Sequence, residues 1–316
     1  MSTTKLVILG AGYTGRELAR LAVERGYQVG ATTRSEESAT TLEELGAQVV
    51  HWSVGDDPAR WVEALGPSTT VVYSIPTLFK DYEPAPPGEL ARHVKPVADI
   101  IDACRRQEIA RFIYLSSTSV YGDHEGRWID ETASRKPSSP YGKMRADIED
   151  YLLESSLDFP VNIARLVGIY GPGRTLVDAI RSGRYRLVDG GKKVTNRIHV
   201  HDIARALLAM IERGGDQDRV FNITDGHPQP VRDLVEFICD RTGLAPPPEQ
   251  SLQDYTRRNP GPNALARWKN TARVLNDRLR KELEFTLVYP DSFAGYQAAL
   301  AQGSSTTTPS GAQRKY

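Results

Sequence analysis

Short runs of apolar residues alternate along the chain with longer segments in which apolar residues recur every three or four positions. The apolar runs predict strands at residues 6–9, 28–32, 48–52, 70–74, 111–116, 161–166 and 220–223. The segments between them predict helices over residues 15–25, 36–45, 58–64, 88–106, 141–155 and 202–213. Strands that alternate with helices in this way are typical of an α/β fold, a doubly wound parallel sheet with helices on both faces.

The alternation loosens after Leu166, where Pro- and Gly-rich stretches appear. We expect residues 1–166 to form the main domain, with residues 197–224 returning to it. Residues 167–196 and 225–301 are expected to form a smaller C-terminal lobe that binds the substrate. Residues 302–316 contain too few apolar side chains to pack, so a disordered tail is predicted.

Composition narrows the classes of partner. The 316 residues include 40 Lys and Arg and 40 Asp and Glu, whereas nucleic-acid binders need a basic surface, so no nucleic-acid partner is predicted. No window approaches the roughly 20 apolar residues that span a bilayer, and residues 6–9 have the length of a strand rather than of a signal peptide. We therefore expect no membrane partner and a cytoplasmic location.

Cys104 and Cys239 lack metal-ligand spacing and are expected to be reduced core thiols. A homodimer is compatible with the sequence.

The first predicted turn carries a dinucleotide-binding pattern. Gly10, Gly12 and Gly15 have the spacing GxGxxG, directly after a strand and at the start of a helix. The first glycine allows the tight turn, the second lets the backbone approach the pyrophosphate, and the third lets the helix pack closely on the strand. This context predicts a Rossmann-type βαβ unit that binds a nicotinamide dinucleotide, with Tyr13 and Thr14 in the same turn. The alternative is a glycine-rich turn without a ligand.

The end of the second strand bears on which nicotinamide is bound. An acidic residue there accepts a hydrogen bond from the ribose 2′-hydroxyl of NAD, whereas an arginine accommodates the 2′-phosphate of NADP. This chain has Arg34 and Ser35 at that point and no acid before Glu36. NADP(H) is therefore favoured over NAD(H), unless Arg34 is an ordinary solvated charge. Arg16 could add a second positive charge to the same phosphate. Ser74, at the end of the fourth strand, completes the predicted cofactor site on this side.

Two later segments carry the residues that are expected to take part in catalysis. Residues 115–122, Leu-Ser-Ser-Thr-Ser-Val-Tyr-Gly, end the fifth strand at the carboxyl edge of the sheet, where open α/β folds bind ligands. Residues 139–145, Ser-Pro-Tyr-Gly-Lys-Met-Arg, begin a helix on which Tyr141 and Arg145 share one face.

With these motifs the chain resembles the extended or atypical short-chain dehydrogenases/reductases, the NAD-dependent epimerase/dehydratase family, and within it the YeeZ-like branch. The resemblance covers about residues 5–301. It also includes Gly-Pro-Gly at residues 171–173, Ile-His-Val-x-Asp at 198–202 and Phe-Asn-Ile at 221–223. It implies an NAD(P)-dependent oxidoreductase or epimerase that acts on a small molecule.

The resemblance implies a catalytic group of Ser117, Tyr141 and Arg145. The tyrosine hydroxyl would exchange a proton with the substrate while hydride moves to or from the nicotinamide, and the serine would orient the substrate oxygen. Because a free tyrosine has a pKa of about 10, a nearby cation is needed to favour the phenolate. The family has a lysine where this chain has Arg145. An arginine supplies the charge and can bond to the ribose, so Tyr141 and Arg145 also belong to the predicted cofactor site, but an arginine cannot relay a proton.

Two sequence features of known family members are absent here, and their absence narrows the class of substrate. Thr118 and Ser119 replace the acidic pair of 4,6-dehydratases, and Gly168 stands where nucleotide-sugar epimerases carry an Asn. Arginines in the following segment could replace that anchor or form a solvated surface: Arg174, Arg181, Arg184 and Arg186. The substrate is expected to be small, and sugar-like or acidic. A catalytically silent NADP(H)-binding regulatory or scaffold protein is the alternative, because the lysine is missing.

Two further interpretations concern the segment before the last predicted helix. Asp202 is predicted to be the N-cap of a helix over residues 203–213. His199 and His201 alternate as on one face of a strand, and without a third ligand nearby we interpret them as structural rather than metal-binding.

Overall fold

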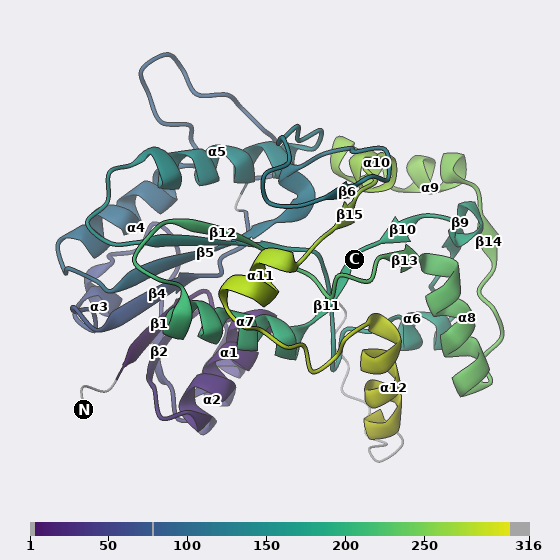
Figure 1. Ribbon diagram of the computed structural model, residues 1–316, viewed down its shortest axis with the longest axis horizontal. Helices are drawn as coiled ribbons and strands as arrows, with labels where there is room; N and C mark the ends of the chain where they lie inside the picture. Colours follow the sequence, from purple (N-terminus) through teal and green to yellow (C-terminus); the bar gives the residue numbers. More distant parts are fainter. Residues whose placement is uncertain (1–3, 78, 304–316) are drawn as a thin grey trace.

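The computed structural model describes residues 4–77 and 79–303, and a parallel sheet lies at its centre (Figure 1). Within these residues the sheet has seven strands in the order β12-β7-β5-β4-β1-β2-β3. Their bounds are β1 (Lys5–Leu9), β2 (Gln28–Thr33), β3 (Gln48–His51), β4 (Thr69–Tyr73), β5 (Arg111–Ser117), β7 (Val161–Leu166) and β12 (Arg219–Ile223). Each predicted strand is present, and the predicted doubly wound Rossmann-type fold is confirmed.

Helices cover the sheet on both faces, and each face has its own apolar core. One core is formed with α1 (Tyr13–Glu24), α2 (Glu36–Glu44), α7 (Val200–Arg213) and α11 (Asp277–Glu282). The other is formed with α3 (Ala59–Val62), α4 (Lys95–Arg105) and α5 (Pro140–Glu154). Figure 1 shows α5 on one side of the sheet and α1, α2 and α7 on the other. Residues 6–9 of β1 and 112–115 of β5 are buried, which explains why each of these strands contains a continuous apolar run in the sequence.

Helix α4 is shorter than predicted. The apolar pattern suggested a helix over residues 88–106, whereas α4 begins at Lys95 with Pro96 in its first turn. A helix starting at residue 88 would hold Pro96 in its interior, where the ring collides with a preceding carbonyl and one hydrogen bond is lost. Proline is tolerated only in the first turn, and it therefore fixes the helix start.

Helix α7 begins earlier than predicted, and Asp202 is not its N-cap. His199 is the cap, and its Nδ1 accepts a hydrogen bond from the backbone N–H of His201 at 3.1 Å. The Asp202 carboxylate is fully buried inside the first turn. It accepts the backbone N–H groups of Val288 and Tyr289, each at 2.8 Å. Because a distant segment occupies this carboxylate, it does not cap its own helix. His201 lies within α7, so the two histidines do not share a strand face.

A smaller lobe follows β7, at the right of Figure 1. Its short strands pair as β8 (Gly168–Tyr170) with β11 (Arg197–His199), β9 (Leu187–Val188) with β14 (Glu249–Gln250), and β10 (Val194–Thr195) with β13 (Gln229–Pro230). A fourth pair joins β6 (Trp128–Ile129) to β15 (Arg273–Val274). The helices are α6 (Leu176–Arg181), α8 (Val231–Thr242), α9 (Leu252–Arg258), α10 (Pro262–Lys269) and α12 (Ser292–Gly303). A separate apolar cluster around Leu234 and Ile238 of α8 holds most of the lobe together.

The remaining expectations concern the tail, the membrane and the cysteines. The predicted disordered tail, residues 302–316, lies outside the described residues except for 302 and 303, which end α12. Among the described helices, none combines the length and the apolar character needed to cross a bilayer. Cys104 in α4 and Cys239 in α8 are buried free thiols, as predicted.

Candidate active site

The glycine turn between β1 and α1 has the geometry of a dinucleotide cradle. Gly10 has φ +82°, and a Cβ there would lie 2.6 Å from the side chain of Ile75. A Cβ on Gly15 would lie 3.1 Å from Ile8 of β1, which shows how closely helix and strand pack. Gly12 is exposed, and no atom lies within 4 Å of where its Cβ would be. The turn therefore leaves open space beside the first N–H groups of α1, contributed by Tyr13 and Thr14, where a pyrophosphate fits.

The other predicted cofactor residues lie at the carboxyl ends of the neighbouring strands. Arg34 directly follows β2 and is exposed, and within the described residues its side chain has no hydrogen bond or ion pair. The Ser35 hydroxyl accepts the backbone N–H of Ser38 and so caps α2. Ser74 follows β4, and its N–H donates to the carbonyl of Leu9 at the end of β1, at 2.8 Å. Because β1 and β4 flank the point at which the strand order reverses, these residues surround the crevice that binds dinucleotides in such sheets.

Ser117 and Tyr141 come from segments that are packed against each other. Ser117 ends β5, and its hydroxyl accepts the N–H of Ser119 in the short 3-10 helix η1 (Thr118–Val120). Tyr141 lies in the first turn of α5, which the Ser139 hydroxyl caps. A Cβ on Gly142 would lie only 2.5 Å from the carbonyl oxygen of Ser119. The close approach at Gly142 therefore holds the first turn of α5 against the end of β5.

The Tyr141 side chain is open to solvent. It is 40% exposed, and its hydroxyl has no hydrogen-bond partner among the described residues. Its backbone N–H donates to the side-chain oxygen of Asn263 in α10. A helix of the second lobe thus contacts the helix that carries the predicted catalytic tyrosine.

Arg145 lies one turn further along α5 and is held by β5. Its Nη1 donates to the carbonyl oxygen of Leu115 at 2.8 Å, two residues before Ser117. It also bonds to the hydroxyl of Tyr114; burial raises the pKa of that phenol to about 12 although Arg145 opposes the rise. These bonds to β5 therefore occupy part of the hydrogen-bonding capacity of the Arg145 guanidinium.

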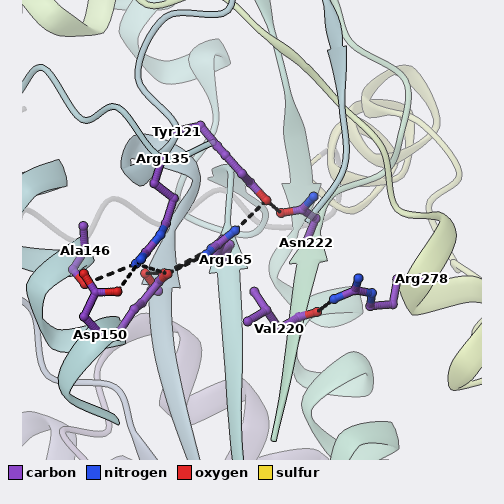
Figure 2. A network of polar contacts seen from close by, with 10 residues as sticks. Tyr121, Arg135, Ala146, Asp150, Arg165, Val220, Asn222 and Arg278 are labelled. Atoms are coloured by element: carbon purple, nitrogen blue, oxygen red, sulfur yellow. Dashed lines mark hydrogen bonds and ion pairs between the residues drawn. The ribbon is translucent and has the colours of Figure 1, made fainter. Parts of the chain in front are cut away.

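A buried polar network beneath the site escaped the sequence analysis (Figure 2). Glu149 of α5 is fully buried and accepts hydrogen bonds from the Ser116 hydroxyl at 2.5 Å and from Nη2 of Arg165 at 2.6 Å. Arg165 also donates to the Tyr121 hydroxyl, which in turn donates to Asn222 of β12. The network links α5 to three strands of the sheet. Its only sequence signal is the four-residue spacing of Tyr141, Arg145 and Glu149.

Among the described residues, no contact joins the arginines of the second lobe into a single substrate anchor. Arg181 pairs with Asp178, while Arg184 and Arg186 bond within their own segment. Arg174 instead lies over the Tyr13 ring, 5.5 Å from its centroid. The Tyr13 hydroxyl donates to the carbonyl of Pro172, which joins the glycine turn to the second lobe.

The two histidines take part in local contacts. The ring of His199 packs on Tyr289, and Nδ1 of His201 lies 2.8 Å from a Glu17 carboxylate oxygen. Within residues 4–77 and 79–303, no group of three or more potential ligand side chains could hold a metal ion.

Comparison with known proteins relates this arrangement to a family. Residues 6–224 match the NAD dependent epimerase/dehydratase family. The chain is 30% identical over 247 residues to 4-hydroxy-2-methyl-3-oxo-4-farnesyl-3,4-dihydroquinoline-1-oxide ketoreductase of Stigmatella aurantiaca, covering 74% of this chain and 72% of the relative. It is 27% identical to protein YeeZ of Escherichia coli K12, covering 91% of this chain and 97% of YeeZ.

A solved structure extends the likeness to the whole fold. A conserved protein of unknown function from Silicibacter pomeroyi superposes with a TM-score of 0.80 and 30% identity, covering 95% of this chain and 99% of that one. The predicted family is confirmed: this chain belongs to the NAD dependent epimerase/dehydratase family, is similar to YeeZ, and is an NAD(P)-dependent oxidoreductase or epimerase.

Proposed function

We propose that the protein is an NADP(H)-dependent oxidoreductase that interconverts a ketone or aldehyde and an alcohol on a small, sugar-like or acidic molecule. The observation that carries the proposal is the close approach of Gly142 to the Ser119 carbonyl. It holds the exposed Tyr141 beside the end of β5, where Ser117 lies. The name of the ketoreductase relative, which is 30% identical, supports carbonyl reduction.

The residues at the sheet edge fit the cofactor. The open space at Gly12 and the first N–H groups of α1 would hold the pyrophosphate. Arg34, which has no anionic partner among the described residues, would bind the 2′-phosphate of NADP(H). Ser74 would line the crevice between β4 and β1. The bound nicotinamide would supply hydride to a carbonyl carbon, or accept it from an alcohol.

The side chains of the site would then manage the proton. In the reducing direction, the Tyr141 hydroxyl donates its proton to the carbonyl oxygen as the carbon receives hydride, which yields the alcohol. The Ser117 hydroxyl holds the same oxygen in place. Arg145 stabilises the resulting phenolate by its charge but cannot pass on a proton. Because Tyr141 is exposed, its proton is recovered directly from solvent.

One observation favours the alternative of a silent cofactor-binding protein. The guanidinium of Arg145 bonds to Leu115 and Tyr114, whereas the family's usual lysine at this position serves catalysis. A protein of this kind would bind NADP(H) without turnover.

A turnover screen separates the two functions. Purified protein is incubated with NADPH, or with NADP⁺ in the reverse direction, and with panels of ketones, aldehydes, sugars and sugar nucleotides. Absorbance of the reduced nicotinamide is followed. We expect consumption of NADPH with at least one carbonyl compound. Tight NADPH binding with no change in absorbance across the panels would favour the silent binding protein.

A further inference from the structure

A cavity of about 520 Å³ opens on the outer side of α1. Its walls come from α1, α2, the segment after β8, the start of α7 and α12. Neither Ser117, Tyr141 nor Arg145 lines it, and neither does Arg34. The cavity is therefore separate from the site described above, although Tyr13 of the glycine turn forms part of its edge.

The charges around the cavity leave an excess of positive charge at this edge. Burial alone would raise the pKa of Glu17, but hydrogen bonds from Arg20 and His201 lower it to about 2, so its negative charge is neutralised in place. Arg16 also lines the cavity, and Arg174 lies over the ring of Tyr13. In the described part of the chain, neither of these two guanidinium groups has an ion-pair partner. An anion at this edge would supply one.

The rest of the cavity is walled by rings and small apolar side chains. The Tyr289 ring lies 4.0 Å from the ring of His199, centroid to centroid, and also contacts His201 edge-on. Ala298 and Ala299 of α12 also line the cavity and leave room there because their side chains are small. Concave sites with mostly apolar walls and a few placed polar groups are typical of small-molecule binding.

We propose that this cavity is a second ligand site, which binds an organic anion with a flat apolar body. The acidic group lies beside Arg16, and the body lies between Tyr289 and Ala299. The site does not depend on the catalytic assignment, because none of the residues proposed for proton transfer lines it. It also gives Arg16 a role other than binding the 2′-phosphate of NADP(H). The two roles predict opposite results when NADP⁺ is present.

The test uses 8-anilinonaphthalene-1-sulfonate, a flat aromatic sulfonate whose fluorescence rises on binding. The full chain is titrated with this probe in the presence of saturating NADP⁺. We expect saturable binding of one equivalent. Arg16→Gln should weaken the affinity about tenfold, the effect of one hydrogen bond to a charged group. Ala299→Trp fills the cavity and should abolish binding, whereas Ala299→Ser should retain it.

Two controls make the result specific. Arg181→Gln removes an arginine that is already paired with Asp178 in α6 and should leave probe affinity unchanged. Tyr141→Phe should also bind the probe normally. A failure of the catalytic proposal can therefore be distinguished from a failure of the second ligand site. Displacement of the probe by NADP⁺ would overturn the inference, as would unchanged affinity in Arg16→Gln. Because Arg16→Gln removes the charge without adding bulk to the cavity, it remains informative even if Ala299→Trp does not fold.

Discussion

Arg145 occupies the position where the sequence motifs predict a catalytic lysine, and two contacts with β5 hold it there. One nitrogen bonds to the Leu115 carbonyl, and the guanidinium also meets the buried hydroxyl of Tyr114. Neither partner is a carboxylate, so these contacts do not neutralise the positive charge of Arg145. That charge lies close to the first turn of α5. Its contribution should therefore be a fixed positive charge rather than a bidentate clamp.

Arg145→Lys should accordingly retain turnover within about threefold, because an ammonium supplies the same charge and can still donate to the Leu115 carbonyl. Arg145→Ala should lose at least tenfold, because it removes the charge and leaves buried acceptors unpaired. Initial rates with NADPH and a substrate from the screen measure both. Lys143→Ala, an exposed change two residues away on α5, is the matched control. Equal loss in the lysine and alanine variants would instead point to a bidentate role.

Arg34 decides cofactor preference in this account. NADPH should bind at least several-fold more tightly than NADH, and Arg34→Ala should erase the difference, because hydrogen bonds to a charged phosphate are worth about 1.5–3 kcal/mol. Titration of each variant with both cofactors measures this. Arg106→Ala, another exposed arginine at the end of α4, should leave the preference intact. Equal affinities of the unmodified protein for the two cofactors would refute the NADP(H) assignment.

At the scale of elements, substitutions in the glycine turn separate an effect on stability from an effect on cofactor affinity. Gly12→Ala places its Cβ in open space, so the protein should keep its melting temperature but lose at least tenfold in NADPH affinity, because the methyl group occupies the path of the pyrophosphate. Gly10→Ala strains a positive φ and meets Ile75, so it should lower the melting temperature as well. Calorimetry and cofactor titration distinguish these outcomes. Normal cofactor affinity in Gly12→Ala would place the pyrophosphate elsewhere.

Strands were predictable and several helix boundaries were not, for physical reasons. Buried parallel strands such as β1 and β5 contain continuous apolar runs, so a local pattern suffices to locate them. The start of α4 depended on Pro96, and the start of α7 depended on which distant backbone the Asp202 carboxylate binds. The strands of the second lobe have two or three residues each, too few to show any periodicity.

The pair Glu149–Arg165 shows why part of the site could not be predicted. Charged side chains are normally solvated, and nothing local in the sequence marks these two as buried partners from α5 and β7. Breaking a buried pair by Glu149→Gln should cost about 3–5 kcal/mol of unfolding free energy, whereas Asp99→Asn in the exposed Lys95–Asp99 pair should cost below about 1 kcal/mol. Urea denaturation measures both. Similar losses in the two variants would mean that the buried network contributes little.

At the scale of the whole molecule, the site depends on segments that are far apart in sequence. Gly10, Ser74 and Ser117 lie at the ends of neighbouring parallel strands, so sheet topology brings the glycine turn and the predicted catalytic serine to one edge. Hydrogen bonds from Tyr13 to Pro172 and from Tyr141 to Asn263 are among the contacts that join the second lobe to this edge. The sequence motifs predict which residues take part, and this assignment stays a prediction. They could not show that α10 contacts the tyrosine helix.

The central claim is that Tyr141 transfers the proton in a nicotinamide-dependent redox reaction, and Tyr141→Phe tests it most directly. The substitution removes only a hydroxyl that has no hydrogen-bond partner among the described residues, so the fold and the NADPH affinity should remain within about twofold of the original. Turnover of the substrate found by screening should fall by about 10²–10⁴-fold, the usual contribution of general acid–base catalysis. Full turnover in Tyr141→Phe, with NADPH affinity unchanged, would contradict the account.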